Sequence, residues 1–423
     1  MEIQKTILKN GLCVMTAERP QIETVSLGIW VNTGSAAETP EDNGISHFIE
    51  HMVFKGTKKR TSLQISEDIE NVGGATNAYT SRHFTCFYAK MLKDDAELAA
   101  DVICDFITSP TFDEKEMVKE KEVVVQEIKQ SNDAPDDLVF DYFQEAAFPN
   151  QACGRTILGP IDHVRSFNKE RMLHYMNTHY AADNMVVVAV GHIKHQDFVK
   201  MIEQRMAGIP EHINYTADKQ IYLGGPKLEC KDIEQTHVVL GFKGSSYQDK
   251  DYYQYSVLST ILGGGMSSRL FQEIREKRGL VYTISSFHQA LKDAGVFGIY
   301  AGTTPKELHE LLPVVADEIK KIMNEPVTDV ELKRAKTQIK ASLLMSLESS
   351  SATAEIIARQ MLLFGRVIPT EEIVEKIENI TAKNLQTLAQ KIFTSTPTYT
   401  LLGCNGKEYP SYDEVKKLLK QAQ

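Results

Sequence analysis

The sequence predicts an α+β protein that contains two related halves. Its 423 residues exceed one ordinary domain, and a hydrophobic content of 42% can supply two cores. Strand and helix patterns recur in the same order in both halves, which is typical of a duplicated unit. A stretch rich in Gly, Pro and polar residues separates the halves. We therefore expect an N-terminal domain at residues 1–210, a linker at 211–227 and a C-terminal domain at 228–423.

The elements of the first half follow from local patterns. A strand at 25–32 leads to a helix that ends before Gly56, and a second helix comes next. A strand at 84–91 alternates as an edge strand does, so an extended peptide could add to it. Helices at 94–108 and from Asp113 onward complete this half.

The second half repeats this order of elements. We expect strands at 237–242 and 296–301, and helices at 252–262, 268–277, 306–323 and 328–344.

The first helix contains the segment His47-Phe-Ile-Glu50-His51. Positions i and i+4 of a helix lie on one face about 6 Å apart, so both imidazoles can reach one metal ion. Glu50 lies near the same face and can hold a water molecule without binding the metal. The order is the reverse of the H-E-x-x-H zinc-protease signature. The pattern indicates a metallopeptidase.

The alternative for this segment is a solvated, histidine-bearing helix surface. Apolar residues surround the motif over much of the helix, so we expect the helix to be largely buried and the histidines to need partners. A polar lead-in at 41–44 is expected to cap its N-terminus. The apolar residues are Ile45, Phe48, Ile49, Met52 and Val53.

Two histidines leave zinc one protein ligand short if one position is to stay open. The helix capped at Asp113 carries Glu120 and Glu127, which lie on nearly the same face about 10.5 Å apart. One of them can bind the metal, while the other lies in the second shell around the metal. The alternative is a solvated acidic helix, against which the valine run 123–125 argues.

These residues resemble the pitrilysin family of zinc metallopeptidases, the inverse zincins. The similarity spans nearly the whole chain and is greatest to bacterial processing peptidases and the mitochondrial processing peptidase β subunit. The matching segments lie at 43–57, 73–81, 120–127 and 136–141. The resemblance implies two α/β-sandwich domains, each a mostly antiparallel sheet with packed helices, that together form half of a clamshell.

The resemblance also implies the roles of the motif residues. His47, His51 and Glu127 would bind one Zn²⁺ ion per chain, and Glu50 would act as the general base. Glu120 would orient a ligand or tune the site.

Only the first half can build this zinc site. When the halves are aligned, Glu120 falls opposite Ala335 and Glu127 opposite Ser342. The resemblance implies that the second half closes over the substrate and supplies Arg275 and Tyr282 as donors to the scissile carbonyl. The alternative is a basic surface turn with a packed tyrosine.

Substrate residues are also implied by the resemblance. Asn77 and Ala78 would lie at the peptide groove, and Phe54 would line an apolar pocket after the cut. Asp137 and Asp141 match an acidic pair that binds an upstream arginine. Alternatively, they are ordinary acids near a helix N-terminus.

Charge and composition bound the remaining possibilities. The net charge of −10 disfavours a nucleic acid partner. No run approaches the roughly 20 apolar residues of a membrane span, and no signal or transit peptide is visible, so we expect a cytoplasmic bacterial protein. Scattered spacing predicts reduced cysteines at Cys13, Cys86, Cys104, Cys153, Cys230 and Cys404.

The combined prediction is a zinc endopeptidase that hydrolyses extended peptides. It would either process basic, targeting-type peptides or degrade oligopeptides. The alternative is a catalytically silent scaffold or partner subunit, against which the complete motif argues. Longer members of the family enclose a chamber with four homologous units, so this chain is expected to form a homodimer, or a heterodimer with a related chain.

Overall fold

The computed structural model describes residues 2–213, 215–404, 406 and 408–422. The chain forms two compact units. The first comprises Met1–Lys129, Thr156–Asp218 and Leu344–Val367, and the second comprises Gln130–Arg155, Lys219–Leu343 and Ile368–Gln423.

These units differ from the predicted contiguous domains by two exchanged helices. Helix α5 (Pro135–Ala147) belongs to the second unit, and helix α12 (Ser350–Phe364) belongs to the first. Each covers an apolar sheet face in the unit that it joins: α12 packs on β3 and β6, and α5 packs on β7, β8 and β11. The unit to which each helix belongs is therefore decided by the apolar sheet face that it buries, and not by its position in the sequence.

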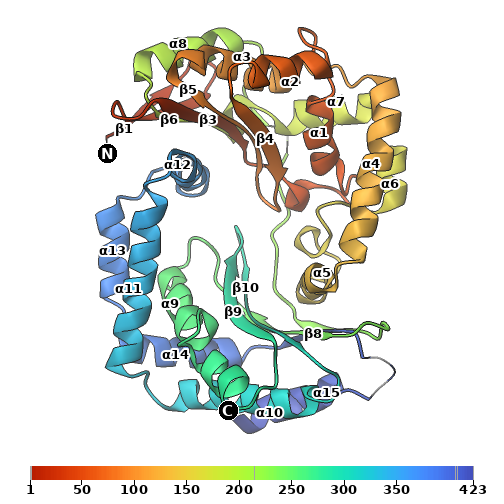
Figure 1. Ribbon diagram of the computed structural model, residues 1–423, viewed down its shortest axis with the longest axis vertical. Coiled ribbons are helices and arrows are strands. Elements are labelled where there is room, and N and C mark those ends of the chain that lie inside the picture. The colour runs from red at the N-terminus through yellow and green to blue at the C-terminus, as the bar shows by residue number, and fades with distance from the viewer. Residues whose placement is uncertain (1, 214, 405, 407, 423) are drawn as a thin grey trace. The chain divides into compact units, whose positions relative to one another are not determined.

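The first unit contains a six-stranded sheet in the order β1-β2-β6-β3-β5-β4 (Figure 1). Its neighbouring strands are antiparallel except for β2 and β6. The strands are β1 (Ile3–Ile7), β2 (Cys13–Glu18), β3 (Thr24–Val31), β4 (Ala75–Thr80), β5 (Thr85–Leu92) and β6 (Met185–Gly191).

Seven further helices belong to the first unit, and a large apolar core lies between the sheet and several of them. Helix α12 covers the opposite face above a smaller core that includes Trp30 and Cys86. The seven helices are α1 (Ile45–Val53), α2 (Ser62–Glu70), α3 (Ala96–Thr108), α4 (Glu114–Asn132), α6 (Ile161–Ser166), α7 (Lys169–His179) and α8 (His195–Arg205).

The second unit contains a five-stranded sheet in the order β7-β11-β8-β10-β9. Figure 1 labels β8, β9 and β10 of this sheet. Among its described strands, β7 and β11 pair in parallel and the other neighbours are antiparallel. The strands are β7 (Gly225–Glu229), β8 (Thr236–Lys243), β9 (Thr283–Ala290), β10 (Gly295–Thr303) and β11 (Thr398–Leu402).

Helices cover both faces of this second sheet. On β9, the ring of Phe287 contacts Phe143 of α5, whereas the next residue, His288, stacks on Tyr255 of α9. Successive side chains of a strand point to opposite faces, so α5 and α9 lie on opposite sides. Besides α5, the helices are α9 (Tyr252–Gly263), α10 (Leu308–Asn324), α11 (Asp329–Ser346), α13 (Thr370–Glu378), α14 (Ala382–Phe393) and α15 (Tyr412–Ala422).

The predicted strands and helices are present, with two local differences. A π-helical turn, η5 (Phe271–Glu276), lies where an ordinary helix at 268–277 was expected. The predicted edge strand is the second correction: β5 lies between β3 and β4, and β4 forms the edge. Strand β4 is short and half exposed, so it lacks the apolar run that makes a strand visible in sequence.

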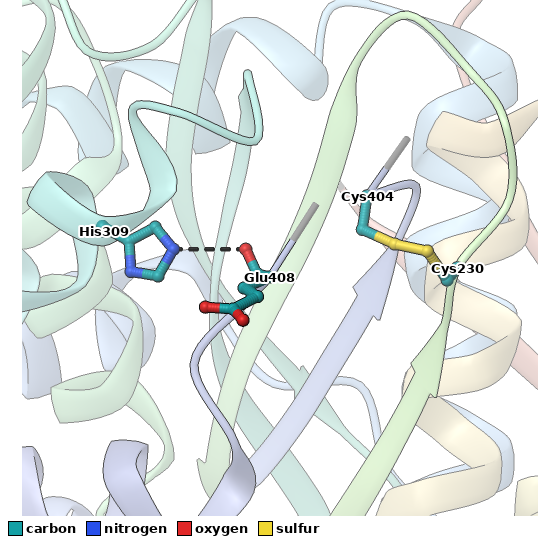
Figure 2. The surroundings of a disulfide bond; sticks show 4 residues. All are labelled: Cys230, His309, Cys404 and Glu408. Atoms are coloured by element: carbon teal, nitrogen blue, oxygen red, sulfur yellow. Dashed lines mark hydrogen bonds between the residues drawn. A yellow bond between two sulfur atoms is a disulfide. The ribbon is translucent and has the colours of Figure 1, made fainter. Parts of the chain in front are cut away.

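The prediction that all six cysteines are reduced is wrong for two of them. Cys230 and Cys404 form a disulfide, shown in Figure 2, with their Cα atoms 5.0 Å apart. They are 174 residues apart in sequence but follow β7 and β11, which pair side by side. The thiols of Cys13, Cys86, Cys104 and Cys153 are buried.

No described helix has both the length and the apolar character needed to cross a membrane.

Candidate metal centre

The motif helix α1 is fixed in the core of the first unit. Seven of its nine residues are buried, His47 among them. Gly44 precedes the helix with φ +98°, and a Cβ there would lie 2.6 Å from the carbonyl oxygen of Leu158. Both the backbone conformation and the close contact therefore favour glycine at this position.

A buried carboxylate caps this helix from outside it. Oε1 of Glu38 accepts a hydrogen bond from the amide of Ser46 (2.9 Å). Its Oε2 accepts bonds from the amide of Gly44 (2.9 Å) and from Nδ2 of Asn43 (3.0 Å). Burial raises the pKa of Glu38, and these hydrogen bonds oppose the rise. Glu38 thus satisfies amides that a helix N-terminus leaves without partners.

Three side chains converge beside this helix. Nε2 of His47 lies 3.7 Å from Oε2 of Glu127, and Nε2 of His51 lies 3.4 Å from the same oxygen. One ligand atom from each residue lies within 4.8 Å of the others. Zinc bonds of about 2.0–2.1 Å in a tetrahedron place ligand atoms about 3.3–3.4 Å apart. The three residues therefore fit a zinc ion.

Glu120 lies on the other side of the His51 ring. Its Oε1 is 2.8 Å from Nδ1 of His51, and Lys55 Nζ is 2.7 Å from its Oε2. A carboxylate at the second ring nitrogen fixes the orientation of a metal-binding histidine and raises its basicity. The two glutamates thus face opposite nitrogens of one ring, which favours Glu127 as the ligand and Glu120 as its support.

The two histidines differ in protonation. Burial, together with repulsion from His51, lowers the pKa of His47 to about 4, so its ring is neutral at pH 7. Burial also acts against a charged His51, but hydrogen bonds with Glu120 and Glu127 raise its pKa to about 9. The same carboxylates that stabilise a proton on His51 would stabilise a metal cation.

Glu50 is half buried on the same helix. Burial raises its pKa, and the hydroxyl and amide of Thr80 on β4 act against that rise. A general base works best with a pKa near the operating pH, so this upward shift suits a proton-accepting role.

Three predicted substrate residues belong to the same unit. Asn77 and Ala78 lie on β4, against which α1 packs, and the amide of Ala78 donates to Oδ1 of Asn77 (2.8 Å). Phe54 directly follows α1, and the centroid of its ring lies 4.8 Å from that of Phe106.

Four other predicted site residues belong to the second unit. Asp137 and Asp141 lie one turn apart on α5, and Asp137 is exposed. Arg275 lies on η5, where its guanidinium stacks over the rings of Phe271 (4.8 Å) and Tyr282 (5.8 Å). The Tyr282 side chain is 76% exposed, and its backbone amide donates to Gly302 (3.0 Å).

Two segments of this chain match known protein families. Residues 13–161 match the family described as insulinase (peptidase family M16), and residues 166–339 match the peptidase M16 inactive domain. The chain belongs to the M16 family. The match to the inactive domain covers much of the half that lacks the zinc motif.

Curated relatives of this M16 chain include zinc proteases. An uncharacterized zinc protease of Rickettsia felis is 40% identical over 401 residues, covering 94% of this chain and 97% of the relative. One from Bacillus subtilis is 36% identical, with 96% and 99% covered. A probable mitochondrial-processing peptidase subunit beta of Arabidopsis thaliana is 34% identical, with 98% and 81% covered. These names support a metallopeptidase.

Solved structures confirm the predicted α+β fold class. A protease from Helicobacter pylori matches with a TM-score of 0.87 at 23% identity, covering 95% of this chain and 99% of that one. A peptidase M16 inactive domain from Pseudomonas fluorescens matches with a TM-score of 0.89 at 19% identity, covering 97% and 100%. At these identities, the likeness concerns the fold alone.

Glu38, Lys55 and Thr80 of this M16 chain support the centre but are not among the residues predicted from the sequence. Lys55 carries a usable signal, because it follows His51 by four residues, a spacing that would share a helix face, although α1 ends at Val53. Glu38 and Thr80 reach α1 from other elements, and no local spacing indicates that contact.

Proposed function

We propose that this chain is a zinc endopeptidase in which His47, His51 and Glu127 hold one zinc ion and Glu50 is the general base. The observation that carries the proposal is the convergence of the three ligand atoms within 4.8 Å of one another. The hydrogen bond between Glu120 and His51 and the zinc-protease relatives support it.

The chain's own residues supply the proton transfers and the orientation. When bound, zinc lowers the pKa of water and polarises a carbonyl. The Glu50 carboxylate takes a proton from the attacking water and delivers it to the leaving amine. Glu120 holds the His51 ring in place, and Lys55 holds Glu120.

Residues of both units are proposed to contact the substrate. Arg275 and Tyr282 would donate to the oxygen of the scissile carbonyl, where charge develops during attack. Strand β4, with Asn77 and Ala78, forms the edge of the first sheet and would accept an extended peptide by main-chain pairing. Phe54 would contact an apolar side chain after the cut.

The proposed function is tested by digestion of a peptide library with metal analysis and light scattering on the same sample. We expect about one zinc per chain, cleavage that a chelator stops and zinc restores, and a dimer. A homodimer, or a heterodimer with a related chain, accords with relatives that are named as subunits. A zinc-loaded chain that cleaves no peptide would instead favour the scaffold alternative, and a monomer during turnover would exclude the dimer.

A processing role for basic peptides predicts a contribution from Asp137 and Asp141. We expect the double change to Asn to weaken cleavage of arginine-containing peptides by about 1–3 kcal/mol in kcat/KM, because it removes a charge-assisted contact. Neutral peptides should be little affected.

The matched control for this experiment is Asp133→Asn, which removes an exposed negative charge shortly before α5. It should alter neither peptide class. An equal loss on both classes in the double variant would show that the two aspartates are structural.

A further inference from the structure

One carboxylate on α12 binds across the face of the first sheet. Glu355 accepts a hydrogen bond from Nε1 of Trp30 (2.8 Å). The hydroxyl of Tyr79 lies 2.6 Å from each of its carboxylate oxygens. Arg359, one turn along α12, lies 3.8 Å from the same carboxylate. Glu355 therefore connects a helix from the C-terminal half of the sequence to strands β3 and β4.

The partners of Glu355 lie in one row of the sheet. Trp30 on β3 pairs with Cys86 on β5, and Cys86 pairs with Tyr79 on β4. All three belong to, or pack against, the core that α12 covers. Burial, Cys86 and Glu355 raise the pKa of Tyr79, so its hydroxyl remains a donor throughout the physiological range.

Strand β4 carries different contacts on its two faces. Tyr79 faces α12, whereas its neighbour Ala78 is buried in the core that contains α1. Thr80 lies on the same side of the strand as Ala78, and β4 packs against α1. Tyr79 and the residues that face the motif helix therefore belong to one short strand.

The sequence of β4 specifies its position only weakly. Ala75, Thr76 and Asn77 are small or polar, and Ala75 and Asn77 are exposed. A strand without a clear apolar face is prone to slip in register, and an edge strand has support on one side only. An apolar side chain at position 355 would fill the space but could not select one register, whereas a carboxylate bonded to Tyr79 can.

We propose that Glu355 is a positioning residue that holds β4, through Tyr79, in the register needed to pair with a peptide. The inference rests on the proposed peptidase function and deepens it. The C-terminal half thus contributes to the peptide-binding edge of the first unit through α12. A strand edge that is already ordered loses no conformational freedom when the peptide binds. Loss of the contact should therefore raise KM and leave kcat little changed.

The kinetic test compares Tyr79→Phe and Glu355→Gln with a matched control in the zinc-loaded chain. The control is Ser351→Ala, which removes the 2.9 Å bond between Ser351 of α12 and Ser26 of β3 without touching β4. Loss of one hydrogen bond to a charged group should raise KM about tenfold and change kcat less than about threefold. The KM of the double variant should rise no more than that of the worse single variant, because both changes break the same contact, between Tyr79 and Glu355.

A second measurement is independent of activity. Hydrogen exchange of the amides at 75–80 should accelerate at least about tenfold in both variants and remain unchanged in Ser351→Ala. Unchanged exchange in β4, or an equal KM rise in the control, would overturn the positioning role. If the wild type cleaves no peptide, the proposed function fails, but the exchange measurement still decides whether Glu355 holds the strand.

Discussion

Glu50→Gln is expected to lower kcat at least about 100-fold while the chain retains its zinc. The amide keeps the size of the side chain but cannot accept a proton at neutral pH, and general-base catalysis contributes about 10²–10⁴-fold. His47, His51 and Glu127 are unchanged, so the metal should remain stoichiometric. Peptide turnover and metal analysis on the same preparation measure both quantities.

The matched control for Glu50 is Glu70→Gln, the same change at an exposed position of α2. It should leave rate and zinc content unaltered. Full activity in Glu50→Gln would exclude Glu50 as the base. Loss of zinc together with activity would instead make it part of the binding site.

The metal-binding candidates could be predicted because their geometry is local. Two histidines four residues apart share a helix face wherever that helix lies. The seven-residue spacing of Glu120 and Glu127 could not show which carboxylate faces which nitrogen, because that depends on how α4 packs beside α1. The structure places them at Nδ1 and Nε2 of His51 respectively.

Features that depend on long-range packing could not be predicted. The exchange of α5 and α12 follows from which sheet face each helix buries, and strand β4 depends on pairing with β5. The Cys230–Cys404 disulfide requires two strands that are distant in sequence to lie side by side. Disulfides are rare in reducing compartments, so the oxidation state of these two cysteines bears directly on a cytoplasmic location.

Glu38 shows why the support of the motif helix escaped prediction. The polar lead-in at 41–44 marked the start of α1 correctly, but the residue directly before the helix is Gly44, which offers no side-chain cap. The carboxylate that binds the first amides comes from six residues earlier. Glu38 is buried, so its role depends on the fold around it.

Glu38→Ala is therefore expected to destabilise the first unit by at least about 3 kcal/mol. The change leaves the amides of Gly44 and Ser46 without an acceptor and removes one of the two acceptors of Asn43 Nδ2, which still donates to the carbonyl oxygen of Thr156. Each lost bond is worth about 1–3 kcal/mol. Trp30 is the single tryptophan of the chain and lies in this unit, so its fluorescence during urea unfolding measures the effect.

Two further variants separate the cap from a general effect of charge. Glu38→Gln should lose less than Glu38→Ala, because its amide oxygen can still accept one of the bonds while its NH₂ group opposes another donor. Glu41→Ala removes an exposed carboxylate from the same lead-in and should change stability by less than about 0.5 kcal/mol. A loss below about 1 kcal/mol in Glu38→Ala would mean that the lead-in itself caps the helix. A loss of about 3 kcal/mol or more that is confined to position 38 would mean that the helix carrying His47 and His51 is stabilised by a carboxylate outside the motif.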